Sequence, residues 1–160
     1  MMFRLLPIVA LMIAGAWYLL GAPSEDSDAA TIINSGSTNR PGFRIVVDRS
    51  GVAELTPTRR RFGARQAQPT LIRRMLPNSL VEAFYSDLKT AKPLDSLPAV
   101  HCAKSASFGS TFTVAFGKEQ TPDLSCGDGG NTVMRDLIRD ASQIITLLQA
   151  TEAGPESGVR

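Results

Sequence analysis

The sequence has few of the residue types from which catalytic and metal sites are usually built. Its 160 residues include one histidine, two cysteines and one tryptophan. A zinc site needs three or four His, Cys or carboxylate ligands, and the single His101 has no carboxylate cluster beside it in the sequence. The 17 basic and 15 acidic residues are too balanced for a highly charged disordered chain, and no Gly-X-Y or heptad repeat is present. These absences exclude several classes and favour a small globular protein without a metal or other cofactor.

Only one long apolar run occurs, and it lies near the N-terminus. Residues 5–22 carry no charge, Arg4 precedes them, and three acidic residues follow within six positions. This layout is typical of a secretory signal peptide or a signal anchor, with the basic end left in the cytoplasm. Eighteen residues of helix would span about 27 Å, so the run is long enough for an anchor. We expect residues 1–29 to be either cleaved after export or retained as an anchor, with the rest periplasmic or extracellular.

The two cysteines are expected to pair. An exported protein meets an oxidising compartment, where an even number of thiols usually forms disulfides. Cys102 and Cys126 are the only candidates, and their bond would close a loop of about 25 residues. The chain-entropy estimate for such a loop is roughly 3.5 kcal/mol. We therefore predict a stabilising Cys102–Cys126 disulfide.

The composition divides the exported part into three segments. Residues 30–42 are rich in Ser, Asn, Gly and Pro, and they are predicted to be a flexible linker. Residues 43–150 hold the regular apolar patterns and are predicted to be the folded domain. Residues 151–160 are predicted to be a disordered polar tail.

Alternating apolar residues predict a β-hairpin at the start of the domain. Phe43, Ile45 and Val47 share one face of an extended segment, and a second run covers residues 52–56 after a turn that ends in Gly51. Residues 71–76 are predicted to add an edge strand.

Two helices are predicted from apolar periodicity and capping patterns. Ser79 and Glu82 have the spacing of a capping box, and the helix that they open must end before Pro93. The strongest periodic signal runs through Ala150, with Asn131 or Thr132 as its N-cap.

A second hairpin is predicted between the helices, with strands at residues 108–116 and 121–126. The order hairpin, helix, hairpin, helix predicts an α+β fold. We expect a small two-layer sandwich, in which an antiparallel sheet of four to five strands carries two helices packed on one face.

Basic charge is concentrated in residues 40–74. This segment has nine arginines against two acidic residues, a net charge of +7, whereas residues 75–160 have a net charge of −3. Guanidinium groups recognise carboxylates and phosphates in bidentate geometry. Six arginines lie within sixteen positions and are the predicted anionic-partner site: Arg59, Arg60, Arg61, Arg65, Arg73 and Arg74.

These features predict a non-catalytic, exported domain of the cell envelope. The predicted partner is an anionic envelope component or an envelope protein, bound through the Arg-rich segment 40–74. Nucleic acid is not expected, because the protein is exported and only Phe62 interleaves with the central arginines. The alternative is a small inhibitor of a secreted or periplasmic hydrolase, with residues 59–68 as the blocking loop. No catalytic constellation is visible, so we do not expect an enzyme.

Overall fold

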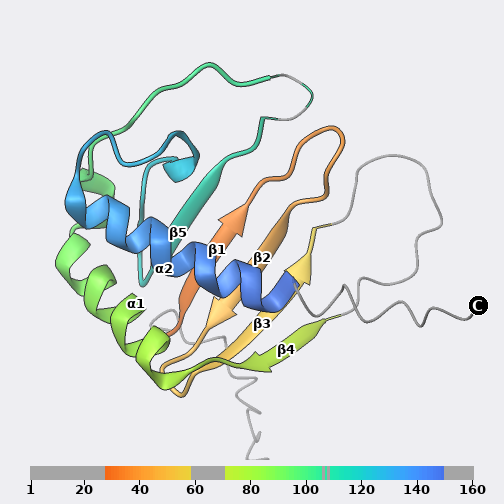
Figure 1. The fold of residues 1–160 in the computed structure, drawn as a ribbon, viewed down its shortest axis with the longest axis vertical. Helices are drawn as coiled ribbons and strands as arrows, with labels where there is room; N and C mark the ends of the chain where they lie inside the picture. The colour runs from red at the N-terminus through yellow and green to blue at the C-terminus, as the bar shows by residue number, and fades with distance from the viewer. Residues whose placement is uncertain (1–27, 59–70, 106, 108, 150–160) are drawn as a thin grey trace, which may run out of the picture.

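The fold is a two-layer α+β sandwich with a six-stranded antiparallel sheet and two helices on one of its faces (Figure 1). The computed structural model describes residues 28–58, 71–105, 107 and 109–149. The predicted leader, tail and Arg-rich loop lie largely outside these residues. The predicted fold class is confirmed, and the sheet has one strand more than expected.

The strand order places the first strand at the centre of the sheet. The elements are, in chain order, β1 (Ala30–Asn34), β2 (Phe43–Val47), β3 (Val52–Pro57), β4 (Ile72–Met75), α1 (Asn78–Ala91), η1 (Leu94–Ser96), β5 (Phe112–Phe116), β6 (Glu119–Gln120), η2 (Leu124–Cys126) and α2 (Thr132–Gln149). The sheet order is β4-β3-β2-β1-β5-β6, and η1 and η2 are single 3₁₀ turns. Helix α1 therefore carries the chain from one edge of the sheet to the far side of β1.

The predicted linker at residues 30–42 is wrong in its first part, because β1 lies there. Ile32 pairs with Ile45 of β2 on one side and with Val114 of β5 on the other. All three side chains are fully buried. The strand was missed because its five residues include only two bulky apolar side chains, and its neighbours in the sequence are polar. Pairing on both edges supplies the burial that its own composition does not indicate.

The first hairpin and the edge strand are confirmed. The turn between β2 and β3 closes through hydrogen bonds from Gly51 N to Asp48 O (3.1 Å) and from Asp48 N to Val52 O (3.0 Å). Gly51 has a φ of 91°, a conformation that favours glycine. Strand β4 then pairs with β3, and Met75 lies opposite Val52.

Helix α1 forms as predicted, but it begins earlier than the capping box implies. The amides of Leu80 and Val81 both donate to the Pro77 carbonyl, so Ser79 already lies within the first turn. No side chain caps this end of the helix. The predicted capping role of Ser79 and Glu82 is therefore wrong.

The second hairpin is shorter than predicted, and its returning strand does not lie at residues 121–126. Strand β5 begins at Phe112, and the returning strand β6 has only two residues. Residues 124–126, predicted as strand, form the 3₁₀ turn η2 instead. Pro122 has no amide to donate, and the Asp123 side chain accepts a hydrogen bond from the Ser125 amide. These two residues end the pairing and start the turn.

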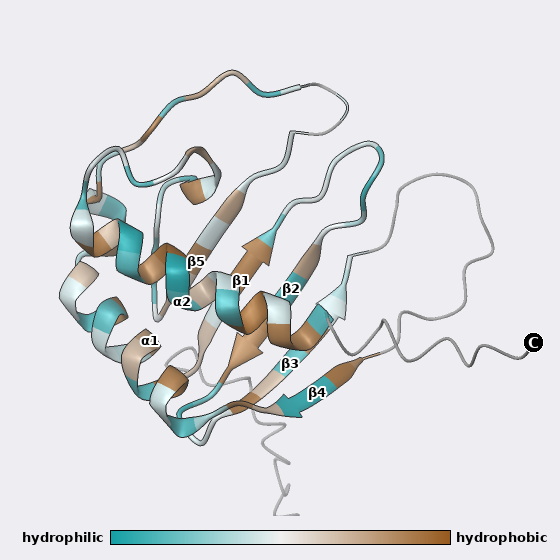
Figure 2. Ribbon diagram, in the orientation of Figure 1, coloured by the Kyte–Doolittle hydropathy of each residue, from teal (hydrophilic) through white to brown (hydrophobic). Residues whose placement is uncertain are grey.

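Helix α2 covers the sheet with the apolar face that its periodicity predicts (Figure 2). Its buried side chains include Met134, Leu137, Ile144 and Leu148. The Asn131 side chain accepts a hydrogen bond from the Met134 amide (3.1 Å), which confirms Asn131 as the N-cap. No helix of the described residues is long and apolar enough to cross a membrane. The apolar run at residues 5–22 lies outside the part of the chain to which this finding applies.

Tyr85 of α1 joins the helix layer to the start of β1. Its hydroxyl donates to the Val47 carbonyl (2.7 Å) and accepts from the Ala30 amide (3.2 Å). The side chain is 7% exposed, and burial raises the pKa of its hydroxyl. The Arg49 guanidinium lies 4.4 Å from the centre of the ring. One side chain thus satisfies polar backbone groups on two adjacent strands.

Three carboxylates surround a single guanidinium where α1 and α2 meet. Arg139 contacts Asp140 (Nε to Oδ1, 2.9 Å), Asp136 (Nη1 to Oδ1, 2.7 Å) and Asp87 of α1 (Nη2 to Oδ2, 3.5 Å). Asp140 is 2% exposed, and its Oδ2 has no hydrogen-bond partner among the described residues. Burial and the adjacent Asp140 carboxylate raise the pKa of Asp87. A protonated Asp87 would supply a donor for this acidic pair.

Replacing Tyr85 by Phe should destabilise the domain without changing its fold. The Ala30 amide and the Val47 carbonyl would lose their shared partner in a buried position, which typically lowers the free energy of unfolding by about 1–3 kcal/mol. Urea unfolding followed by circular dichroism measures this loss. Ser86→Ala, an exposed change one residue further along α1, is the control and should shift stability by less than about 0.5 kcal/mol. Equal effects of the two changes would contradict the role assigned to Tyr85.

The Asp87→Asn variant should gain stability relative to the natural protein as pH rises. A raised folded-state pKa means that Asp87 stabilises the fold fully below its unfolded value of 3.8 and loses this contribution as pH rises through the higher folded value. Asparagine keeps the neutral form at every pH. The difference in unfolding free energy between the two proteins should therefore increase from about pH 4 upward. Asp95→Asn, which changes an exposed carboxylate in η1, is the control, and a pH-independent difference for Asp87→Asn would disprove the linkage.

Candidate functional site

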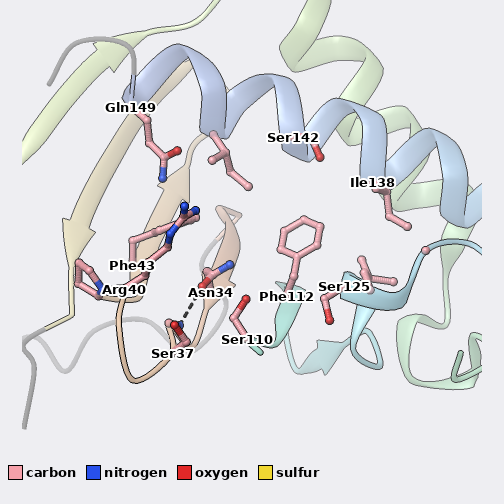
Figure 3. Close-up of a pocket in the computed structure, with 15 residues that line it drawn as sticks. Asn34, Ser37, Arg40, Phe43, Ser110, Phe112, Ser125, Ile138, Ser142 and Gln149 are labelled. Carbon is pink, nitrogen blue, oxygen red and sulfur yellow. Dashed lines mark hydrogen bonds between the residues drawn. The ribbon is translucent and has the colours of Figure 1, made fainter. Parts of the chain in front are cut away.

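A cavity of about 760 Å³ lies beneath α2, at the end of the sheet where β1 ends and β5 begins (Figure 3). We term it the α2 pocket. Its walls come from the β1–β2 loop, the first residues of β2 and β5, the η2 turn and one face of α2. Segments far apart in the sequence therefore meet around one space.

The β1–β2 loop is folded tightly and carries Arg40 to the pocket. The Gly36 amide donates to the Asn34 side-chain oxygen (2.8 Å), and the Ser37 amide donates to the Arg40 carbonyl (2.8 Å). Gly36 has a φ of 67°, and a Cβ there would lie 2.2 Å from the backbone nitrogen of Gly42. Glycine is thus required at the neck of the loop. Figure 3 shows the Arg40 side chain extending from this loop toward the cavity beneath α2.

The same loop is attached to the start of β5. Ser35 donates its amide to the Thr111 carbonyl (3.0 Å), and its hydroxyl accepts from the Thr111 amide (2.8 Å). This pair of bonds continues the β1–β5 ladder beyond the strands. It sets the distance between the two walls that β1 and β5 contribute to the pocket.

Asp123 organises the wall that η2 forms. Its Oδ1 accepts from the amides of Phe112 (2.9 Å) and Ser125 (3.0 Å), and its Oδ2 forms an ion pair with Lys104. Burial alone would raise the pKa of Asp123, but the Lys104 ammonium and the two amides hold this pKa well below its usual value. The carboxylate is therefore ionised at neutral pH and joins β5, η2 and the segment before β5.

The predicted disulfide lies in this wall. Cys102 and Cys126 are bonded, with their Cα atoms 5.5 Å apart. Cys126 stands between Ser125 and Gly127, and both of these neighbours line the pocket. The crosslink attaches the pocket wall to the otherwise irregular segment that follows η1.

Helix α2 contributes one continuous face to the pocket. Ile138, Ser142, Ile145 and Gln149 recur at intervals of four, three and four residues, so they lie on one side of the helix. Phe112 projects toward them from the sheet (Figure 3). The isoleucines and Phe112 form an apolar wall, and Gln149 adds an amide at the end nearest the β1–β2 loop.

Among the described residues that line the pocket, Arg40 is the only charged one. No described carboxylate forms an ion pair with its guanidinium, and the side chain is exposed. The Ser37 hydroxyl oxygen beside it is buried and has no hydrogen-bond partner in the described part of the chain. Within the described part of the chain, the pocket therefore has one positive charge without an acidic partner and a hydroxyl without a hydrogen-bond partner.

The arginines predicted as a single site are not brought together where the structure describes them. Arg73 faces away from the helices and pairs with Glu54 (Nε to Oε1, 3.3 Å). Arg74 faces the helices and donates to the Leu147 carbonyl near the end of α2. Four further members of the predicted site lie outside the described residues, as does the loop 59–68 of the inhibitor hypothesis: Arg59, Arg60, Arg61 and Arg65.

The other described arginines of segment 40–74 also have partners. Arg49 forms an ion pair with Asp28 (Nε to Oδ1, 2.8 Å), and Arg44 donates to the Thr31 hydroxyl at 3.5 Å. Among the five arginines of this segment in the described residues, only Arg40 lacks such a partner. Arg40 belongs to the basic segment 40–74 but is not among the six arginines predicted as the anionic-partner site. Recognising it requires the position of β1, which composition alone did not reveal.

Comparisons with known proteins do not assign a family. No protein-family model matches the sequence, and no curated protein gives a significant match. Among the described residues, no group of three or more His, Cys, Asp or Glu side chains could hold a metal ion. The α2 pocket is therefore the main guide to the function of this chain.

Removing the disulfide should lower stability and loosen the pocket wall. We expect the Cys102→Ser, Cys126→Ser double variant to lose about 3.5 kcal/mol of unfolding free energy, because its unfolded chain is no longer crosslinked. Urea unfolding with and without dithiothreitol measures the effect. Dithiothreitol should lower the unfolding free energy of the natural protein to that of the double variant. It should not change the unfolding free energy of the variant. An unfolding midpoint of the natural protein that dithiothreitol does not move would contradict the assigned role.

Proposed function

We propose that this chain is an exported, non-catalytic binding domain of the cell envelope, and that an anionic ligand binds in the α2 pocket. The observation that carries the proposal is Arg40, which among the described residues is the only charged one in the pocket lining and lacks an acidic partner. A guanidinium in this position favours an anion because its five N–H donors and its charge are both available.

Export is supported by two independent features. The sequence before β1 has the layout of a signal peptide or signal anchor, with a single basic residue ahead of the apolar run. The disulfide between Cys102 and Cys126 is consistent with an oxidising compartment. The proposal places the domain on the periplasmic or extracellular side of the membrane, either released or anchored by residues 5–22.

A binding role suits the pocket better than a catalytic one. Its described lining residues include several serines, but no histidine or carboxylate that could act as their general base. His101 is exposed and is not among the lining residues. The groups that face the cavity can hold a ligand by charge, hydrogen bonds and apolar contact, without an activated nucleophile.

Titration with small anions tests this function. The exported full chain, labelled with ¹⁵N, would be titrated with acetate and with inorganic phosphate at low ionic strength. We expect the amide signals of Ser37, Arg40 and Ser142 to shift, because these residues line the pocket. Arg40→Gln should weaken binding at least tenfold, which matches the loss of one charge-assisted interaction of about 1.4 kcal/mol or more.

The matched control is Arg73→Gln, which removes the same charge from the opposite face of the sheet. This variant should bind the anions as the natural protein does. If both substitutions weakened anion binding equally, the loss would reflect only the lower net charge of the protein. This result would overturn the proposed pocket. Signal shifts confined to residues remote from the pocket would do the same.

A further inference from the structure

The α2 pocket combines a charged and polar group of residues from the β1–β2 loop with apolar side chains of α2 and β5, among which Ser142 and Gln149 of α2 are polar. Arg40, Asn34 and Ser37 supply the polar side from the β1–β2 loop. Ile138 and Ile145 of α2 supply an apolar side, and Phe112 lies between the two (Figure 3). A ligand that satisfies both sides must carry a polar, negatively charged end and an apolar body. A bare inorganic anion would use only the loop side.

The charge of the lining limits the charge of the ligand. One guanidinium balances one negative charge, and the described lining residues include no second cation. A doubly charged phosphate monoester would leave one charge uncompensated next to apolar side chains, which is unfavourable. A carboxylate has a single charge and a planar pair of oxygens that matches the guanidinium fork. The side-chain nitrogen of Asn34 adds a donor, because its oxygen already accepts from Gly36.

The size of the cavity suits a small organic acid. Its volume of about 760 Å³ falls within the range typical of small-molecule sites. The isoleucines and Phe112 can cover a chain or ring extending from the carboxylate. Each methylene moved from water to such a wall strengthens binding by up to about fourfold.

We propose that the ligand of the α2 pocket is a small amphipathic carboxylic acid, with its carboxylate on Arg40 and its apolar body between Phe112 and the isoleucines of α2. This assignment rests on the proposed function and names the ligand class. It makes Ile138 and Ile145 determinants of specificity, because they select for the length and apolar character of the acid. Arg40 selects for its charge.

Calorimetric titration of the exported full chain with butanoate, hexanoate and octanoate tests this ligand class. Affinity should rise about two- to fourfold for each added methylene. Octanamide, which has the same chain without the charge, should bind at least tenfold more weakly than octanoate. In Arg40→Gln this difference between octanoate and octanamide should disappear.

Filling the cavity provides a second test that does not remove a stabilising contact. Ser142 is an exposed helix residue that lines the pocket, so Ser142→Leu should occupy the space of the apolar body and reduce octanoate binding at least tenfold. Gln143→Leu is the matched control, because Gln143 is also exposed on α2 but does not line this cavity. The control should bind octanoate normally.

The outcomes separate the ligand class from the binding function. Binding of acetate or phosphate that depends on Arg40, with no gain from butanoate to octanoate, would overturn the amphipathic acid and leave the anion pocket in place. Tighter binding of a tripeptide with a C-terminal leucine than of octanoate would also overturn it in favour of a peptide carboxylate. Absence of Arg40-dependent binding by every probe would overturn both proposals.

Discussion

Strand β1 is the element on which the rest of the structure depends, because it joins the two parts of the sheet. On one side it pairs with β2, which leads to β3 and β4, and on the other side it pairs with β5, which leads to β6. The Tyr85 hydroxyl bonds to the backbone at its first residue, and the Ser35–Thr111 hydrogen bonds continue its ladder beyond the last residue. The loop that bears Arg40 starts directly after it. The contact of Tyr85 between the helix layer and the sheet, and the walls of the α2 pocket, therefore both depend on the position of β1.

The sequence predicted well those parts of the fold whose signals are local. The first hairpin has alternation and a glycine turn within about fifteen residues, and α2 has an uninterrupted apolar period. Strand β1 has no such local signal in the sequence. Thr31 and Ile32 become buried only because two strands from distant parts of the chain flank them. The strand predicted at residues 121–126 is wrong for the opposite reason, and the returning strand β6 lies at Glu119–Gln120 instead. A chain that could have continued pairing is stopped by Pro122 and by the hydrogen bonds of Asp123.

The candidate site was less predictable than the fold, because it depends on which charges remain unpaired in space. The disulfide could be predicted, since only two cysteines are present. The density of arginines could be counted, but strand geometry places Arg73 and Arg74 on opposite faces of the sheet. Each then meets a partner from another element, Glu54 of β3 or the Leu147 carbonyl of α2. The two described members of the predicted site are thereby separated, and Arg40, at the start of the basic segment 40–74, becomes the informative residue.

Helix α2 lies between two groups of described residues in which charge is unevenly matched. On the side that meets α1, Arg139 alone faces three carboxylates. On the side that lines the pocket, Arg40 faces no described carboxylate, and Ile138 and Ile145 complete the wall. Both sides belong to the same rigid helix of eighteen residues. The packing of α1 against α2 therefore influences the width of the pocket, because any displacement of α2 moves the apolar wall relative to the loop that carries Arg40.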